Sequence, residues 1–152
     1  MKIVIAAGGK FRSDAEKALY ERYIQRLPWK TSLIEVDDKR SKDDVRRRGT
    51  ESQKLLDAIP EGAIVVPLDE SGTALSSTKF ANKLGKWQDQ GLRDIVFLIG
   101  GADGLDSVVL DRANLVLSLG PMTWPHLLVR GLLAEQLYRA STVLSGHPYH
   151  RA

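Results

Sequence analysis

The chain has 152 residues, of which 43% are hydrophobic and 27% are charged, and its formal net charge at pH 7 is +3. This length predicts one domain, residues 1–152, with no room for a separate recognition module. No apolar run reaches the roughly 18 residues needed to cross a bilayer, so we expect no membrane association. Cysteine is absent, which excludes disulfides and thiolate metal sites and is typical of a reducing cytoplasm.

The charge is distributed unevenly along the chain. Residues 1–58 contain 14 Lys/Arg and 10 Asp/Glu, residues 59–118 contain 5 and 8, and residues 119–152 contain 3 and 1, with all three histidines. A basic, histidine-bearing end beside an acidic middle allows one face to meet a polyanion. A solvated surface with uneven charge explains the same pattern, and charge alone does not decide between the two.

Strand and helix patterns alternate along the first half of the chain. The apolar run 3–7 is too short for a signal peptide and predicts a first strand. Apolar residues at helical spacing predict a helix over 13–27, which ends at Pro28. A strand over 31–36 follows, and then a charged helix from Asp43 to about Ile59, which ends at Pro60.

The same alternation continues in the second half. Short apolar runs at 63–68 and 94–99 predict fully buried strands, and a helix from Ser76 or Ser77 to about Asp89 separates them. A short helix over 107–112, a last strand over 113–119 and a final helix from Pro125 to about Thr142 follow. This order predicts the α/β class, with a mainly parallel sheet and helices on both of its faces.

The predicted final helix is apolar around most of its circumference. A terminal helix of a domain this small normally keeps one polar side in water. Burial against both the sheet and a second copy of the chain explains the pattern, and so does a deeply buried core helix; we expect a homodimer. The apolar positions are Leu127, Leu128, Val129, Leu132, Leu133, Leu137 and Ala140.

Three loops with glycine, 68–72, 100–104 and 119–125, follow predicted buried strands. Ligands of parallel sheets bind beyond the carboxyl ends of the strands, and glycine lets an adenine edge approach the backbone. Glycines at strand ends also form ordinary tight turns. The dinucleotide fingerprint, the Walker phosphate loop and the G-x-S-x-G elbow are absent from the sequence, which argues against nucleoside triphosphate hydrolysis and serine-based hydrolysis.

The C-terminal run 146–152 combines an aromatic ring, two imidazoles and a guanidinium. Tyrosine and histidine stack on bases, arginine binds phosphate, and histidine moves protons near neutral pH. A tail that only docks on its own domain explains the composition equally well. Without cysteine or a nearby acidic pattern, His126, His147 and His150 do not predict zinc, and we expect no metal site.

Four motifs, 97–104, 122–126, 135–140 and 148–151, resemble those of the RlmH family of SPOUT, or α/β-knot, methyltransferases, in the same order. The resemblance covers essentially the whole chain. It implies a C-terminal trefoil knot, which no periodicity argument predicts, and a homodimer. It also implies the cofactor S-adenosyl-L-methionine and methylation of N3 of a pseudouridine in 23S rRNA, on assembled ribosomes in the cytoplasm.

The resemblance further implies the residues of the site. Backbone groups of eight residues are expected to hold the cofactor: Leu68, Gly100, Leu119, Gly120, Pro121, Met122, Thr123 and Trp124. RNA contacts are expected from His126, Arg130 and Arg139. Catalytic roles fall to the tail residues Tyr149, His150 and Arg151, contributed across the dimer.

Two positions depart from the family pattern. Thr73 stands where a lysine is expected after the glycine, and the chain ends in Ala152, where some relatives carry an acid. The first departure leaves the fine contacts of the 68–73 loop open. Two other functions remain at this point: methylation of another RNA base, and ribosome binding without catalysis. A flavodoxin-like nucleotide binder is a more distant alternative.

Overall fold

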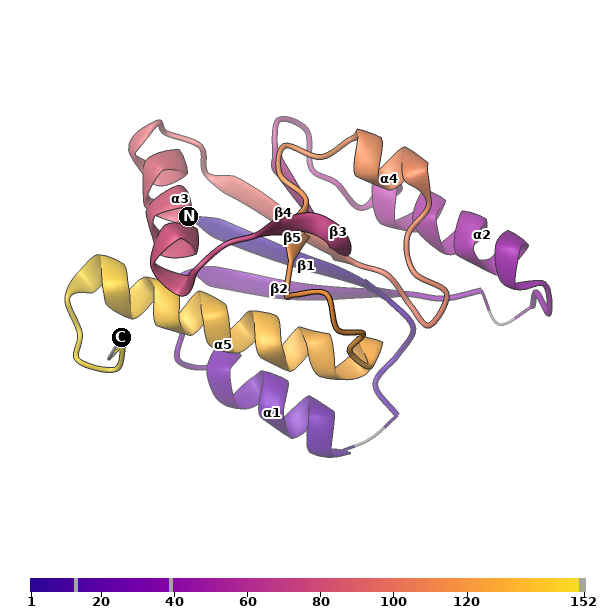
Figure 1. The fold of residues 1–152 in the computed structure, drawn as a ribbon, viewed down its shortest axis with the longest axis horizontal. Coiled ribbons are helices and arrows are strands. Elements are labelled where there is room, and N and C mark those ends of the chain that lie inside the picture. Colours follow the sequence, from indigo (N-terminus) through magenta and orange to yellow (C-terminus); the bar gives the residue numbers. More distant parts are fainter. Residues whose placement is uncertain (13, 39, 151–152) are drawn as a thin grey trace.

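The computed structural model describes residues 1–12, 14–38 and 40–150. Ten elements form the chain: β1 (Lys2–Gly8), α1 (Asp14–Ile24), β2 (Lys30–Val36), α2 (Asp44–Asp57), β3 (Ile64–Ala74), α3 (Ser77–Asp89), β4 (Asp94–Ile99), α4 (Ser107–Asp111), β5 (Leu117–Ser118) and α5 (His126–Ser145). The strands form one parallel sheet in the order β2-β1-β4-β3-β5 (Figure 1). The predicted α/β class and parallel sheet are confirmed.

Different helices cover the two faces of the sheet, because successive side chains of a strand point to opposite faces. On one face, residues such as Ile5 and Phe97 pack in a core with residues of α1, α3 and α5. On the other face, Val96 and Leu98 pack with residues of α2 and α4, so the predicted cover on both faces is confirmed (Figure 1). β1 and β4 are buried on both sides, which explains their continuous apolar runs.

The edge formed by β3 and β5 differs from the prediction. β3 continues past Leu68 to Ala74, and its pairing with β5 shifts register between Leu68 and Thr73. Gly72 permits this path, because a Cβ at that position would lie 2.6 Å from the Val116 carbonyl oxygen. Of the predicted strand 113–119, only Leu117–Ser118 forms a strand. The pattern of apolar residues continues further than the hydrogen-bonded ladder.

The predicted helix starts agree with the structure, with one difference in detail. Side-chain oxygens of Asp43 and Ser76 accept backbone N–H groups at the starts of α2 and α3. Pro125 precedes α5 in an extended conformation instead of occupying its first turn. α5 ends at Gly146, whose φ of 75° suits a residue without a side chain. The trefoil knot remains a prediction.

Candidate active site

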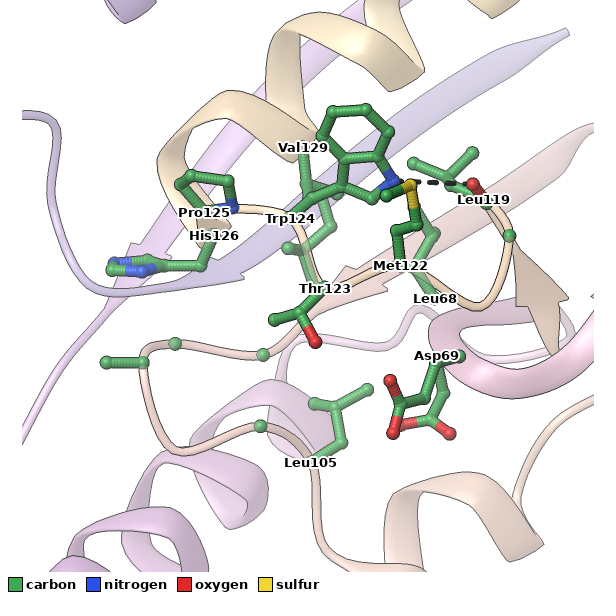
Figure 2. A pocket seen from close by; sticks show the side chains of 17 residues that line it. Leu68, Asp69, Leu105, Leu119, Met122, Thr123, Trp124, Pro125, His126 and Val129 are labelled. Atoms are coloured by element: carbon green, nitrogen blue, oxygen red, sulfur yellow. Dashed lines mark hydrogen bonds between the residues drawn. The ribbon is translucent and has the colours of Figure 1, made fainter.

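A cavity of about 550 Å³ opens beside the carboxyl ends of β4 and β5 and the middle of β3 (Figure 2). Its walls come from the three loops that the sequence predicts as a ligand site. Of the eight residues predicted to hold a cofactor, seven line it, and only Pro121, which is exposed in the same loop, does not. The predicted cofactor residues did not include Asp69, which lines the cavity directly after Leu68.

The Gly100–Gly104 loop is a tight turn that presents bare backbone to the cavity. The Gly104 N–H donates to the Gly101 carbonyl over 3.0 Å, and the two residues form an isolated bridge. A Cβ on Gly100 would lie 2.6 Å from the Gly104 carbonyl carbon. The glycines are therefore required by the turn itself. They also leave peptide groups accessible to a ligand, so these glycines can serve both a tight turn and a ligand site.

The 119–124 loop forms the opposite wall. Ser118 Oγ accepts the Gly120 N–H over 3.1 Å and donates to the Glu70 carbonyl over 3.2 Å, which ties this loop to β3. The Trp124 indole N–H donates to the Leu119 carbonyl over 3.4 Å. Trp124 remains 42% exposed and Met122 73% exposed, an unusual exposure for large apolar side chains. Both side chains line the cavity (Figure 2).

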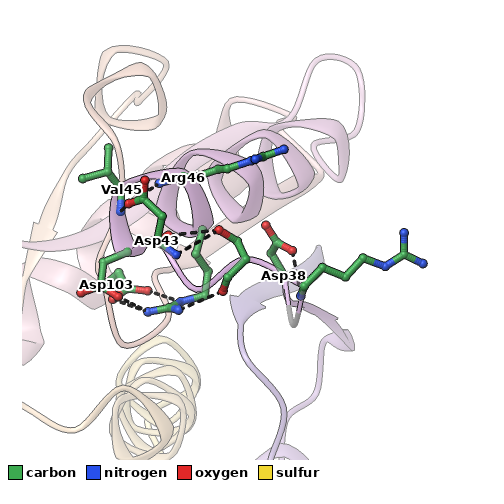
Figure 3. A network of polar contacts seen from close by, with 9 residues as sticks. Asp38, Asp43, Val45, Arg46 and Asp103 are labelled. Carbon is green, nitrogen blue, oxygen red and sulfur yellow. Dashed lines mark hydrogen bonds and ion pairs between the residues drawn. The ribbon is translucent and has the colours of Figure 1, made fainter.

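α2 fixes the glycine loop from behind through ion pairs. The Arg47 guanidinium donates to both carboxylate oxygens of Asp103, over 2.7 and 3.1 Å (Figure 3). Arg48 pairs with Asp106 over 2.6 Å. The hydrogen bond from Arg47 holds the pKa of Asp103 below its usual range. No sequence pattern links these residues, because each pair is more than fifty positions apart.

Arg130, predicted to contact RNA, is fully buried, with 0% exposure. Its guanidinium pairs with Glu35 over 2.6 Å, donates to the Gly8 and Gly9 carbonyls over 3.2 and 2.9 Å, and lies 4.4 Å from the Phe11 ring centroid. Burial alone would raise the pKa of Glu35, but hydrogen bonds from Arg130 and the Phe11 N–H lower it overall. In this arrangement Arg130 has a structural role and is not open to RNA. The helix that carries it turns this side inward, which sequence alone did not reveal.

His126, also predicted to contact RNA, begins α5 and is half-buried. It lines the first cavity and also a second one of about 730 Å³, which shares Gly101 and Ala102 with the first. Burial lowers the pKa of His126, and the positive charges of Arg130 and Arg12 lower it further. Both effects favour the neutral imidazole, the form that can accept a proton.

The predicted catalytic tail docks on the middle of α5. The Tyr149 hydroxyl donates to Glu135 over 3.1 Å, and Arg139, the third residue predicted to contact RNA, pairs with the same carboxylate over 2.5 Å. Burial raises the pKa of Tyr149 to about 12, and hydrogen bonds with Tyr23 and Glu135 act in the same direction. His150 is half-buried, and Arg151 lies outside the described residues.

Within one chain, the tail does not reach the cavity. Glu135 is nine residues after His126, so Tyr149 contacts α5 about 14 Å along the helix from its start. Figure 1 shows the end of α5 and the segment that follows it on the far side of the helix from the 119–125 loop. The structure therefore brings seven of the eight predicted cofactor residues together but leaves Tyr149 apart from them. Among residues 1–12, 14–38 and 40–150, no cluster of three or more His, Asp or Glu could hold a metal ion, and no helix could span a membrane.

Comparison with known proteins identifies the family of this chain. The model described as "Predicted SPOUT methyltransferase" matches residues 1–150. A protein of Rhodospirillum centenum named "Ribosomal RNA large subunit methyltransferase H" is 51% identical, over 100% of both chains. A protein of the same name from Paramagnetospirillum magneticum is 50% identical over 99% of both chains.

Solved structures of low sequence identity share the fold. A probable methylase family protein from Haemophilus influenzae has a TM-score of 0.60 at 13% identity, with 99% of this chain and 70% of that chain covered. TrmJ from Z. mobilis has a TM-score of 0.56 at 12% identity, with 91% and 68% covered. Together with the full-length relatives, these matches establish that the chain belongs to the SPOUT methyltransferases, within the family of the ribosomal RNA large subunit methyltransferase H proteins.

Proposed function

We propose that this protein transfers a methyl group from S-adenosyl-L-methionine to N3 of a pseudouridine in 23S rRNA, on assembled ribosomes in the cytoplasm. The observation that carries the proposal is the cavity made by loops 68–72, 100–104 and 119–125. The relatives' names give the substrate as large-subunit ribosomal RNA. The base and the atom rest on the family resemblance of the four sequence motifs.

The residues of the cavity fit the cofactor. Its volume of about 550 Å³ lies within the range of sites that take small organic ligands. Apolar side chains such as Leu68 and Leu119 provide surfaces for an adenine ring, and bare peptide groups at Gly100 can read its edge. Asp69 lines the cavity, and its carboxylate, which accepts hydrogen bonds from Ser71, suits hydroxyl groups or a positive charge. When bound, the cofactor supplies an activated methyl group on a sulfonium, a chemistry that requires no metal ion.

The catalytic tail requires a second copy of the chain. Since Tyr149 lies about 14 Å along α5 from its start, residues of another protomer are needed if the tail is to act at the cavity. A groove of about 600 Å³ along β5 and α5, lined by Leu75, Leu132 and Trp124 among others, offers an apolar surface for that copy. β5 is a short edge strand, which suits coverage by a partner. We therefore propose a homodimer in which each tail completes the other site.

Two experiments test the function. Replacement of Tyr149, His150 and Arg151 together by alanine should abolish methylation of ribosomes and leave cofactor affinity, measured by calorimetry, within about twofold. An equal loss of cofactor binding would refute this division of roles. Mass analysis of rRNA from a deletion strain should show one lost methyl group on a pseudouridine. A methyl lost from another base supports the alternative base, and cofactor binding that is absent altogether supports a ribosome-binding protein without catalysis.

A separate experiment tests whether the substrate is the assembled ribosome or the isolated RNA. A dimer of 152-residue chains offers limited contact area, so we expect it to recognise a preformed ribosomal surface. Assembled ribosomes should therefore be methylated faster than isolated 23S rRNA at equal concentration. Faster methylation of the naked RNA would contradict this expectation.

A further inference from the structure

A second cavity adjoins the proposed cofactor cavity and has no role so far. Its volume is about 730 Å³, and it lies between the Gly9–Arg12 turn after β1, the start of α2 and the Gly101–Asp103 turn after β4. The two cavities share Gly101, Ala102 and His126, so they meet at the start of α5. A molecule in one cavity therefore lies next to a molecule in the other.

His126 is the only side chain longer than alanine that borders both cavities within the described residues. Its Nε2 faces the β1 turn, because a Cβ built on Gly9 would lie 3.2 Å from that nitrogen. Figure 2 shows the imidazole directed away from Trp124 and Thr123. Glycine at position 9, with φ of 84°, keeps this nitrogen uncovered by a side chain.

The charges around His126 favour its neutral form. Burial lowers its pKa below the ordinary value of 6.5; Arg130 on its own helix and Arg12 on the β1 turn lower it further, and Asp103 opposes them. Lys10 also lines the second cavity, and the other charged lining residues are Asp37, Asp38, Arg47 and Glu51. One ring nitrogen of a neutral imidazole has a free lone pair.

Other groups near the cavity are poorer proton acceptors. Asp103 is held as a carboxylate by Arg47, and its low pKa makes it a weak base. Burial raises the pKa of Glu51, which strengthens it as a base, but the residue is only 6% exposed and is therefore closed to a substrate. In its docked position Tyr149 has a pKa raised to about 12, so it keeps its proton at neutral pH. His126 has both the position and the protonation state that the reaction needs.

The substrate chemistry matches this arrangement. A uracil-like base is flat and uncharged, and its N3–H lies between two carbonyl groups. Methyltransferases act on bases taken out of the stack, so a separate hollow beside the cofactor is needed. Lys10 and Arg12 stand on the rim of the second cavity and suit the phosphates beside the target nucleotide.

We propose that the second cavity receives the extruded RNA base and that His126 Nε2 accepts the N3 proton as the methyl group is transferred. This inference rests on the proposed function. In the step, the new N3–CH₃ bond forms as the sulfur–methyl bond breaks, and the bonding electrons return to the sulfur. The N3 proton passes to His126 and then to water, which restores the neutral imidazole.

The test combines His126→Asn with a control, Gln88→Asn, on the exposed side of α3. His126→Asn should bind S-adenosylmethionine within about threefold of wild type and methylate ribosomes at least about 100-fold more slowly in single turnovers. The wild-type rate should fall below pH 6.5, and this acid limb should be absent in the variant. Gln88→Asn should keep the wild-type rate and pH profile. A fast His126→Asn enzyme with an unchanged acid limb would overturn the proposal.

Imidazole titration by NMR gives a readout that does not depend on activity. The signal absent from His126→Asn should titrate below pH 6.5 in the wild type. Arg12→Ala should raise the pKa of His126, because it removes a positive neighbour. It should also move the acid limb of methylation to higher pH by the same amount. The control Arg22→Ala, on the exposed side of α1, should change neither the pKa nor the acid limb. An acid limb that does not follow the NMR pKa would refute His126 as the acceptor. Wild-type protein that methylates no pseudouridine would instead refute the proposed function.

Discussion

Replacement of Arg130 by methionine tests whether this residue stabilises the fold or contacts RNA. Methionine is unbranched and fills irregular space, so it preserves much of the packing and removes the charge. The change deletes the ion pair with Glu35 and the hydrogen bonds to the Gly8 and Gly9 carbonyls. It also removes a cation from the Phe11 ring.

The expected loss in the free energy of unfolding depends on how exposed Glu35, the remaining partner, is to water. Removal of one member of a buried ion pair costs about 3 to 5 kcal/mol, because the other charge is left without compensation. Glu35 keeps a 2.8 Å hydrogen bond from the Phe11 N–H, and its side chain is 27% exposed, so water can reach it. We therefore expect a loss near the lower limit, about 3 kcal/mol. For a chain of this size, that corresponds to a melting temperature lower by about 6 to 12 °C.

Urea unfolding at pH 7 measures this loss, with Arg22→Met on the exposed side of α1 as the control, expected within about 0.5 kcal/mol of wild type. The difference should shrink in acid, since the pKa of Glu35 lies below its usual value and its stabilisation is lost as pH falls through that range. A loss of unfolding free energy below about 1 kcal/mol, combined with tenfold weaker ribosome binding, would refute the structural role of Arg130 and favour its role as an RNA contact.

Three further predictions concern the cavity and its supports. Gly100→Ala should weaken cofactor binding at least about tenfold in calorimetry, since its Cβ would lie 2.6 Å from the Gly104 carbonyl carbon; unchanged affinity would contradict the backbone role. Trp124→Ala should reduce cofactor affinity with less than about 1 kcal/mol of destabilisation, because the side chain is 42% exposed; global unfolding would count against it. Arg47→Met should lower the urea midpoint of unfolding at pH 7, and lower it less in acid, where Asp103 becomes protonated; a pH-independent shift would exclude the ion pair as its source.

The sequence was sufficient for the order and class of the elements. Continuous apolar runs identified the buried strands, and Asp43 and Ser76 marked helix starts, because these signals are local. The edge strands were less predictable. The extent of β3 and β5 depends on a register shift at Leu68–Thr73, which is a tertiary pairing with no local signal.

The functional site, like the fold, could be predicted only in part from the sequence. Loop glycines after buried strands led directly to the first cavity, since parallel strands end at one edge of the sheet. The second cavity could not be predicted, because it lies between segments near residues 10, 40, 102 and 126. The role of Arg130 was also hidden, since an arginine in a sequence is usually exposed and its burial depends on a partner, Glu35, almost a hundred residues away.

Arg130 connects the stability of the fold to the chemistry proposed for His126. The two residues are four apart on α5, so they lie on the same side of its first turns. By binding the Gly8 and Gly9 carbonyls, Arg130 holds the β1 turn in place beside His126, the proposed proton acceptor. Its charge also lowers the pKa of His126. Slow methylation by Arg130→Met would therefore not indicate an RNA contact by itself; a raised pKa of His126 with unchanged ribosome affinity would identify the indirect effect.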